Sequence, residues 1–240
     1  MQFTVTAQTR LTDSVYRLTL AGDTAKITRP GQFVQLALPG FYLRRPISVC
    51  DWSEGSLTLI YKVVGEGTKA MTTLTHGTEL DLLTGLGNGF DISKCGEKPL
   101  LVGGGVGLPP MYGLCKTLLA AGKKPQILMG FNSADEVFLR EEFAALSVPC
   151  TVTTADGSEG VRGFVTDALS ELDFDSVCAC GPEPMLKALY NACDVPGQFS
   201  FESRMACGFG ACMGCTCKTK YGAKRICKDG PVLEREEIIW

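Results

Sequence analysis

Four cysteines near the C-terminus have the spacing of an iron–sulfur ligand set. Cys207, Cys212, Cys215 and Cys227 follow the pattern C-x4-C-x2-C-x11-C. This is the plant-type spacing for a [2Fe–2S] cluster, in which three thiolates of one loop and one distant thiolate converge on a small inorganic core. Glycines between these cysteines allow the loop to bend and bring amide N–H groups toward the sulfur atoms; they are Gly208, Gly210 and Gly214.

Two other interpretations of these cysteines stay open. A structural zinc ion also takes four cysteines, although zinc sites favour paired C-x2-C or C-x4-C knuckles over one loop with a remote ligand. The alternative is a set of inert, buried thiols. Cys217 lies outside the pattern and is interpreted as a bystander. The chain has one histidine, His76, so we expect a metal or cofactor rather than a histidine base to carry the chemistry.

A glycine-rich loop in the middle of the chain suits a dinucleotide pyrophosphate. Residues 102–110 read V-G-G-G-V-G-L-P-P and join an apolar, strand-like segment to a helix-like one. Backbone amides and the positive end of a helix favour phosphate at such a loop. The standard Rossmann fingerprint is not met, because Pro110 takes the third glycine position and no acidic residue stands at 131–133. The alternative is a tight turn between strand and helix.

A second phosphate-binding pattern lies in the N-terminal part of the chain. Residues 43–48 read L-R-R-P-I-S, and residues 65–68 read G-E-G-T. The planar fork of an arginine makes paired hydrogen bonds to a pyrophosphate, and a Gly-Thr turn offers free amides and a hydroxyl. On composition alone, an exposed arginine pair and an ordinary hairpin turn explain the same residues.

The elements that must position these groups divide the chain into three regions. Apolar residues alternate with polar ones in the first 90 residues, which predicts short strands in an antiparallel barrel or sandwich. From Lys98 on, strand-like segments alternate with helix-like ones, which predicts a parallel α/β sheet. The predicted strands are 99–102, 126–131, 151–154 and 176–180, and the predicted helices are 108–121, 135–146, 164–172 and 183–192.

The predicted fold is α+β and multidomain, with three domains in tandem. They are a β-barrel at residues 1–95, an α/β domain at 96–198 and a small cluster domain at 199–240. The last region has little hydrophobic periodicity, so a metal is expected to hold it together.

Composition narrows the classes of function. A hydrophobic fraction of 45% excludes a disordered chain, and a net charge of −3 gives no basic surface for nucleic acid. The N-terminus has no apolar core of a signal peptide, and no stretch is apolar enough to span a membrane. We therefore expect a cytoplasmic protein, without nucleic acid or membrane partners, whose 12 cysteines are reduced.

The barrel motifs, followed by the glycine loop, resemble the ferredoxin-NADP reductase superfamily. The resemblance implies that Arg45 binds the FAD pyrophosphate and that Ser48 lies against the isoalloxazine ring. Many members carry an aromatic residue where this chain has Ile47, so the group that stacks on the flavin is left open. The full set implied for FAD is Arg45, Pro46, Ile47, Ser48, Ile60, Tyr61, Lys62, Gly67 and Thr68.

The same resemblance extends to a nicotinamide site. Residues 180–185 read C-G-P-E-P-M and match a motif of that family, whose cysteine lies near the nicotinamide ring, so Cys180 is the candidate catalytic residue. No arginine stands at 131–135 to pair with a 2′-phosphate, which favours NAD over NADP. The set implied for NAD is Gly103, Gly104, Gly105, Gly107, Cys180, Gly181, Pro182 and Met185.

The order of the three regions resembles one family within this superfamily, the electron transfer subunits of dihydroorotate dehydrogenase B. Residues 83–90 (LTGLGNGF), 202–215 (ESRMACGFGACMGC) and 226–232 (ICKDGPV) carry the resemblance, which covers essentially the whole chain. It implies FAD, [2Fe–2S] and NAD as cofactors, an FMN-containing catalytic partner, a heterotetramer of two subunits of each kind, and a role in pyrimidine (UMP) biosynthesis.

Other reductases of the same plan are the alternative. They include the flavin subunit of a sulfide dehydrogenase, a bifurcating ferredoxin-NAD(P) oxidoreductase and a hydrogenase diaphorase. Some of those replace the first cluster cysteine by aspartate, whereas this chain has Cys207. A zinc-binding module without redox chemistry is the alternative from another class.

Overall fold

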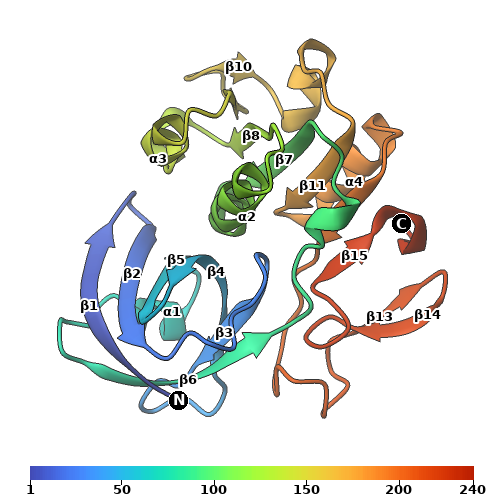
Figure 1. The fold of residues 1–240 in the computed structure, drawn as a ribbon. Helices are drawn as coiled ribbons and strands as arrows, with labels where there is room; N and C mark the ends of the chain where they lie inside the picture. Colours follow the sequence, from blue (N-terminus) through green and yellow to red (C-terminus); the bar gives the residue numbers. More distant parts are fainter.

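The computed structural model describes residues 1–240 and shows a barrel, a sheet covered by helices and a C-terminal region (Figure 1). The barrel is closed and antiparallel, with strand order β1-β2-β5-β4-β3-β6. A short helix, α1 (Glu66–Met71), follows β5. The six strands are β1 (Gln2–Arg10), β2 (Val15–Gly22), β3 (Phe33–Leu36), β4 (Arg45–Ser53), β5 (Ser56–Lys62) and β6 (Glu79–Leu86). The predicted barrel is confirmed.

Both faces of some barrel strands are buried. On β3, Val34 and Leu36 belong to the barrel core, whereas Phe33 packs with residues of the sheet and the C-terminal region. On β5, Tyr61 lies in the barrel core and Ile60 packs against the sheet domain. The sequence alternation marks the inner face correctly, and the outer face is buried as well because the other regions cover it.

The second region is a seven-stranded sheet with the order β10-β9-β8-β7-β11-β12-β15. Its strands are parallel except for β15, which pairs with β12 in the antiparallel sense. The order reverses between β7 and β11, the place where sheets of this kind bind ligands. The strands are β7 (Pro99–Gly104), β8 (Gln126–Phe131), β9 (Cys150–Thr154), β10 (Val161–Arg162), β11 (Ser176–Cys180), β12 (Gly197–Ser200) and β15 (Val232–Glu234).

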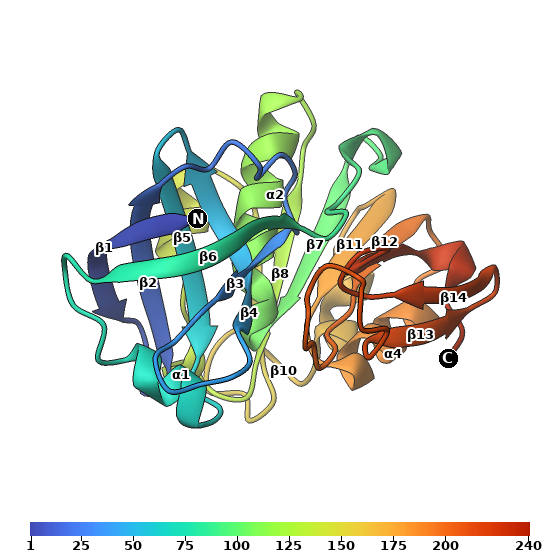
Figure 2. The ribbon, with the colours of Figure 1, turned by 90° about the horizontal axis from the view of Figure 1, so that it is seen from below.

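Helix α2 (Leu108–Ala120) joins the barrel to this sheet. Figure 2 shows it between the barrel strands and β7 and β8. A Cβ added at Gly113 would lie 2.8 Å from the carbonyl oxygen of Cys50 on β4, so the helix backbone touches the barrel directly. Ion pairs cross the same interface, from Lys116 to Asp51 at 2.7 Å and from Arg17 to Glu142.

Two predicted helices differ from the structure. The segment 135–146 is split into a 3-10 turn (Ala134–Glu136) and helix α3 (Arg140–Ala145). Leu139, with φ of 65°, stands between them and is buried, so its packing overrides the local helical pattern. The segment 164–172 is a 3-10 helix (Val165–Glu171), whereas helix α4 (Glu183–Ala192) has the predicted bounds.

The C-terminal region is a loop, a hairpin and one strand of the larger sheet. The hairpin consists of β13 (Thr216–Thr219) and β14 (Gly222–Arg225). The division expected between residues 198 and 199 falls within β12, and β15 returns to pair with that strand. Further 3-10 turns lie at Ile92–Lys94, Gly105–Gly107 and Arg235–Glu237.

None of the helices combines the length and the apolar character needed to cross a membrane.

Candidate redox sites

The structure brings Arg45 and Gly67 together, although 22 positions separate them in the sequence. A Cβ added at Gly67 would lie 1.9 Å from Nε of Arg45, so the guanidinium lies directly across the glycine backbone. The guanidinium stacks on the ring of Phe41 at 4.8 Å and donates a hydrogen bond of 2.6 Å to the carbonyl of Leu43. A positioned guanidinium next to the backbone of a glycine is an arrangement that suits a pyrophosphate.

Thr68 holds this turn in place. Its hydroxyl accepts hydrogen bonds from the amides of Val64 and Gly65, at 2.9 and 3.2 Å, and lies 3.0 Å from the carbonyl of Gly65. The hydroxyl that the sequence offers to a phosphate is thus used to cap α1, and Thr68 shapes the site through the backbone.

The residues expected along the flavin divide between the two faces of the barrel wall. Ser48 is paired with Phe33 across β4 and β3, and Phe33 points out of the barrel, so Ser48 faces outward too. Ile60 also faces outward, toward the sheet domain. Ile47 and Tyr61 instead pack with the barrel core, which leaves their backbone and not their side chains for a flavin on the outer face.

Tyr61 is fixed inside the barrel by its neighbours. It is 2% exposed and stacks on Tyr16 with ring centroids 5.8 Å apart. Burial raises the pKa of its hydroxyl, which lies 3.4 Å from Oε1 of Gln8. Its position is that of a structural core residue.

A cleft of about 580 Å³ opens at the carboxyl ends of β7, β8, β9 and β11. Predicted nucleotide residues line it, namely Gly104, Gly105, Pro182 and Met185. The other predicted glycines allow close packing: a Cβ at Gly107 would lie 2.1 Å from the carbonyl oxygen of Cys180, and one at Gly103 would lie 2.6 Å from Cγ of Leu108. Gly181 has φ of 154°, which favours glycine.

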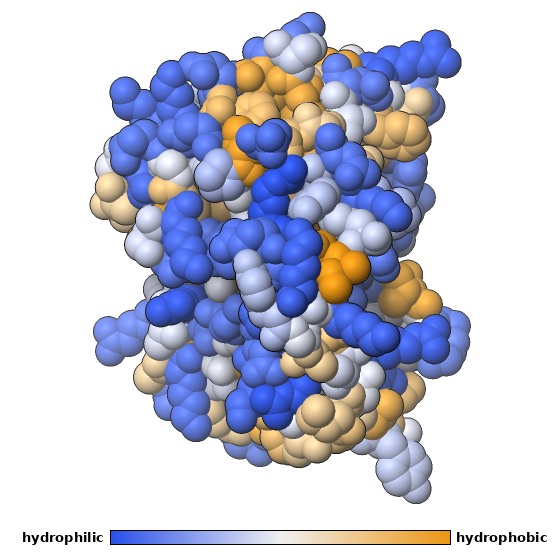
Figure 3. Space-filling view, turned by 90° about the vertical axis from the view of Figure 1, so that its right-hand side faces the viewer, coloured by the Kyte–Doolittle hydropathy of each residue, from blue (hydrophilic) through white to orange (hydrophobic).

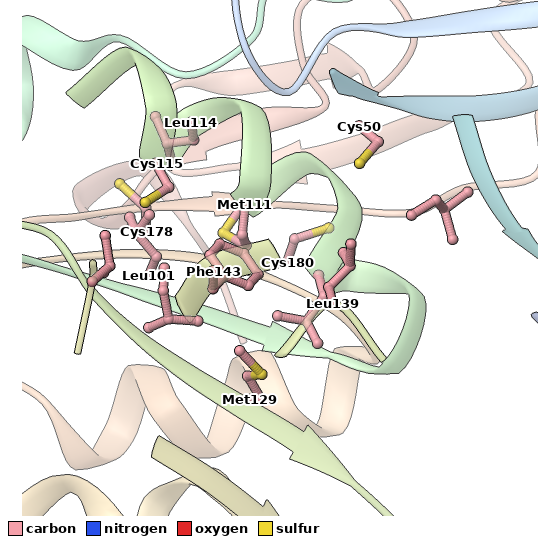
Figure 4. Packing of buried hydrophobic residues seen from close by; sticks show 14 of the residues in the cluster. Cys50, Leu101, Met111, Leu114, Cys115, Met129, Leu139, Phe143, Cys178 and Cys180 are labelled. Carbon is pink, nitrogen blue, oxygen red and sulfur yellow. The ribbon is translucent and has the colours of Figure 1, made fainter. Parts of the chain in front are cut away.

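Cys180 is not among the residues that line this cleft. It is 3% exposed and belongs to the same buried hydrophobic group as Met111, Leu139 and Phe143 (Figure 4). Burial raises the pKa of the thiol to about 12, so the neutral thiol is present at physiological pH. The thiol therefore contributes packing volume and no negative charge.

Two acidic residues of the cleft were not anticipated from the sequence. Glu136 follows β8, and its carboxylate accepts a hydrogen bond of 2.8 Å from the side-chain amide of Asn132. The 3-10 turn brings Glu136 back to the end of β8. An acidic group was expected only at residues 131–133, so Glu136 was missed from the sequence. Glu202 stands two residues after β12; desolvation by the surrounding protein raises the pKa of its carboxyl, which still reaches solvent through the cleft.

Lys62 connects the barrel to this cleft. It lines the cleft beside Glu136, and the two side chains lie 3.7 Å apart. A residue predicted for the flavin therefore also borders the candidate nucleotide site.

The cluster thiols form two pairs. The amide of Cys212 donates to Sγ of Cys207, and the amide of Cys227 donates to Sγ of Cys215, both at 3.4 Å. No three thiols lie at the spacing of a closed metal shell. A [2Fe–2S] cluster takes four cysteine thiolates on two iron atoms, and two pairs of thiols suit that donor set.

The electrostatics at Cys207 favour a thiolate, whereas those at Cys227 favour the neutral thiol. The amides of Cys212 and Phe209 lower the pKa of the Cys207 thiol to about 6, and the thiolate is the form that binds iron. Cys212 is exposed, whereas Cys215 and Cys227 are buried. Burial, together with Cys215, raises the pKa of the Cys227 thiol to about 12, so iron must displace a proton there.

Arg225 connects the cluster loop to Asp229 through an ion pair and a backbone hydrogen bond. Arg225 donates to the carboxylate of Asp229 at 2.8 and 3.1 Å and to the carbonyl of Gly210 at 3.0 Å. Hydrogen bonds from Arg225 lower the pKa of Asp229 to about 2. Gly208 and Gly210 have φ of 77° and 90°, so the bends predicted at these glycines are present.

Two motifs of the sequence meet at a seam between the barrel and the cluster region. Asn88, in the segment 83–90, donates to the carbonyls of Asp229 and Val232 at 3.3 and 2.8 Å. Its Oδ1 accepts from the amide of Val232 at 3.2 Å, and its own amide donates to Gly230 at 2.7 Å. The Asp-Gly-Pro motif at residues 229–231 is thus hydrogen-bonded to the segment 83–90, which follows the last strand of the barrel.

Comparisons with known proteins identify two parts of the chain. Residues 202–239 match the iron-sulfur cluster binding domain of dihydroorotate dehydrogenase B. Residues 101–190 match the oxidoreductase NAD-binding domain.

Among solved structures, that of an NADH-dependent reduced ferredoxin-NADP oxidoreductase is 31% identical, with a TM-score of 0.91 over 99% of this chain and 90% of that one. A ferredoxin NADP+ reductase from Neisseria gonorrhoeae with bound FAD and NADP has a TM-score of 0.69 over 80% of this chain and 89% of its own, at 14% identity, which shows a shared fold.

Curated relatives match nearly the full length. The electron transfer subunit of dihydroorotate dehydrogenase B (NAD(+)) from Fusobacterium nucleatum is 44% identical, covering 98% of this chain and 96% of its own. The same subunit from Bacillus pumilus is 41% identical with the same coverage. The chain is an NAD-linked flavin and iron–sulfur oxidoreductase subunit with FAD, [2Fe–2S] and NAD as its cofactors, and it belongs to the family of dihydroorotate dehydrogenase B electron transfer subunits.

Proposed function

We propose that this chain takes electrons from an FMN-containing dihydroorotate dehydrogenase catalytic subunit and delivers them to NAD, in the synthesis of UMP. The names of its relatives and the two matched domains support this role. When bound, the cluster carries single electrons and FAD exchanges two electrons with NAD.

One observation carries the proposal: strand β3 connects a residue expected at the flavin with residues expected to bind the cluster. Phe33 on β3 is paired with Ser48 on β4. The same Phe33 belongs to the packed group that contains Cys215 and Cys227. Electron transfer requires that donor and acceptor be close, and this arrangement at β3 supports the proposal.

The residues have separate tasks in this proposal. Arg45 and Gly67 hold the pyrophosphate of FAD, and Ser48 and Ile60 form the outer wall against its ring. The cleft at the sheet takes the nucleotide, with phosphate at Gly105, which has a left-handed backbone and open space on its Cβ side and lies just before helix α2. Because Glu136 would repel a 2′-phosphate, we propose NAD rather than NADP as the substrate.

The cluster loop offers a surface for the catalytic partner. Cys212 is exposed, and the side chains of Phe209 and Met213 beside it are both 55% exposed. The side of the molecule that carries the C-terminal hairpin is mostly hydrophilic, with hydrophobic atoms in limited groups (Figure 3). Apolar side chains at the loop suit a partner contact. We propose a heterotetramer of two subunits of each kind.

Two further points belong to the proposal. The three units are residues 1–95, 96–198 and 199–240, with β15 as the strand that ties the third to the second. We also propose a cytoplasmic location, because a reducing compartment keeps cysteines from forming disulfides and available as metal ligands.

The test is co-expression with the catalytic subunit and an assay of NAD reduction. The purified complex is expected to show flavin and iron–sulfur absorption and to reduce NAD when dihydroorotate is added. The catalytic subunit alone, as control, is expected to oxidise dihydroorotate with an artificial acceptor and to leave NAD unreduced. A complex that reduces NAD from sulfide or reduced ferredoxin but not from dihydroorotate contradicts the proposal.

The structural likeness to ferredoxin-NADP oxidoreductase favours a second candidate, a subunit of an enzyme that exchanges electrons with ferredoxin. The same assay, with reduced ferredoxin replacing dihydroorotate, separates the two.

A further inference from the structure

Gln35 is the polar side chain that the protein itself leaves unsatisfied near the redox sites. It is 0% exposed, and neither Nε2 nor Oε1 has a hydrogen-bond partner within the chain. Leaving a buried amide without a partner destabilises the folded state, so such a group in a folded protein calls for an explanation.

The position of Gln35 on β3 directs its side chain out of the barrel. Val34 and Leu36, on either side of it, belong to the barrel core, and Phe33 packs toward the cluster region. Since side chains alternate along a strand, Gln35 points the same way as Phe33. Across the sheet it is paired with Pro46, the residue after Arg45 in the flavin strand.

The amide of Gln35 lies against the cluster loop. A Cβ added at Gly208 would lie 2.5 Å from both Cδ and Nε2 of Gln35 and 2.8 Å from Oε1, so the amide plane rests on the backbone of Gly208. Gly208 directly follows Cys207, whose sulfur accepts the amide of Cys212.

Arg44 does not satisfy this side chain. Its Nη1 lies 3.5 Å from the main-chain carbonyl of Gln35 and 2.8 Å from that of Asp81, and its Nη2 pairs with the Asp81 carboxylate. Because Gly208 adjoins Cys207 in the chain, the sulfur at Cys207 is the cluster acceptor nearest in sequence to the glycine on which the Gln35 amide rests.

We propose that Gln35 is a positioning residue that donates a hydrogen bond from its side-chain amide to a cluster sulfur at Cys207. This rests on the cluster being held by the four cysteines, as in the proposed function. Hydrogen bonds to sulfur stabilise the reduced cluster, which carries more negative charge, and so raise its reduction potential. Gln35 thereby favours acceptance of an electron next to the flavin strand.

The experiment compares Gln35→Leu with Gln35→Met in the complete complex. Both substitutions keep the approximate size of the side chain and remove the N–H donor. The control is Gln8→Leu, the same chemical change in the barrel, where the amide of Gln8 bonds to Thr72. The cluster potential is measured by a redox titration followed by electron paramagnetic resonance, and the FAD potential by absorbance of the same samples.

Both Gln35 variants are expected to shift the cluster to a more negative potential and to leave the FAD potential unchanged. They are also expected to lose an exchangeable-proton coupling to the cluster that the parent and Gln8→Leu retain. An unchanged cluster potential, or a shift confined to FAD, overturns the inference. Failure of the proposed function is distinguishable, because it shows in the parent complex as no NAD reduction from dihydroorotate.

Discussion

The barrel and the C-terminal region hold their candidate cofactor sites by different means. The barrel is closed and surrounds its own core of 15 buried hydrophobic residues. The C-terminal region has no separate core of this kind: Cys215, Ile226, Cys227 and Leu233 belong to a group shared with the sheet and with Phe33. The candidate flavin site therefore lies on a domain with its own hydrophobic core. The candidate cluster site lies on a region whose hydrophobic core includes residues of its neighbours.

This difference assigns different roles to the contacts around each site. At the barrel, Arg45 lies on β4 of the closed ring of strands, and Gly67 lies on α1, which follows β5. At the cluster, the loop depends on the Arg225–Asp229 brace, on Asn88 and on β15. Iron binding is expected to contribute more to the order of the C-terminal region than FAD binding contributes to the order of the barrel.

Loss of a cluster ligand is expected to have the largest effect. Cys212→Ser removes an exposed sulfur ligand without opening a cavity in the core, and NAD reduction by dihydroorotate in the complex should fall at least about 100-fold. NADH oxidation by ferricyanide should stay close to the parent rate, because the barrel and cleft are untouched. Cys217→Ser is the matched control and should retain the cluster. Equal loss of both activities in Cys212→Ser, with FAD still bound, contradicts the separation of the two regions.

Crowding the flavin site is expected to come next. In Gly67→Ala the new Cβ would lie 1.9 Å from Nε of Arg45, so the guanidinium must move. FAD binding should weaken by about 10- to 100-fold, the value of a charge-assisted hydrogen bond, as measured by fluorescence titration of the apoprotein. Gly65→Ala is the control, because nothing lies within 4 Å of its Cβ and its backbone is extended. Similar losses in both variants argue against a specific role of Arg45.

Breaking the seam tests whether the C-terminal region depends on the barrel. Asn88→Ala leaves the amide of Val232 and two carbonyls without their partner, which should cost about 1–3 kcal/mol. Hydrogen exchange should accelerate in residues 207–234 and stay unchanged in β1, β2 and β5. Asn191→Ala, at an exposed position on α4, should change neither. Equal acceleration in the barrel shows that the two regions unfold as one.

The smallest effect on activity is expected from a substitution at Cys180, which lies on β11 of the sheet domain. Cys180→Ala should slow flavin reduction by NADH about 10-fold or less, because the neutral thiol supplies only shape. Its folded-state pKa of about 12 exceeds the ordinary value of 9.0, so the folded chain holds the proton more tightly, and this contribution to stability is lost as pH rises from 9.0 toward 12.

Stopped-flow rates at pH 7, 8 and 9 provide the measurement for Cys180. The parent and the alanine variant are expected to show parallel pH profiles, since the thiol does not ionise over this range. A step near pH 8 or 9 that is present in the parent and missing in the variant assigns the thiolate a direct role.

Local patterns predicted those elements that are periodic and bounded by turn residues. Strands β8 and β11 and helix α4 have the predicted bounds, because Gly181-Pro182 and the apolar runs define them. The helix predicted at 135–146 is wrong, since buried Leu139 interrupts it with a left-handed backbone. Boundaries of this kind depend on packing with other segments, which a local pattern does not contain.

The sequence by itself determined which chemistry to expect: cysteine spacing predicts an iron–sulfur ligand set, and a glycine loop between strand and helix predicts a phosphate site. Only the tertiary structure decided which groups meet, as it placed Arg45 on Gly67, Asn88 on Val232 and Gln35 on Gly208. Ligand type and loop flexibility are properties of neighbouring residues. Contacts between distant segments follow from strand order and closure of the barrel, and these are set by how the whole chain buries its apolar surface.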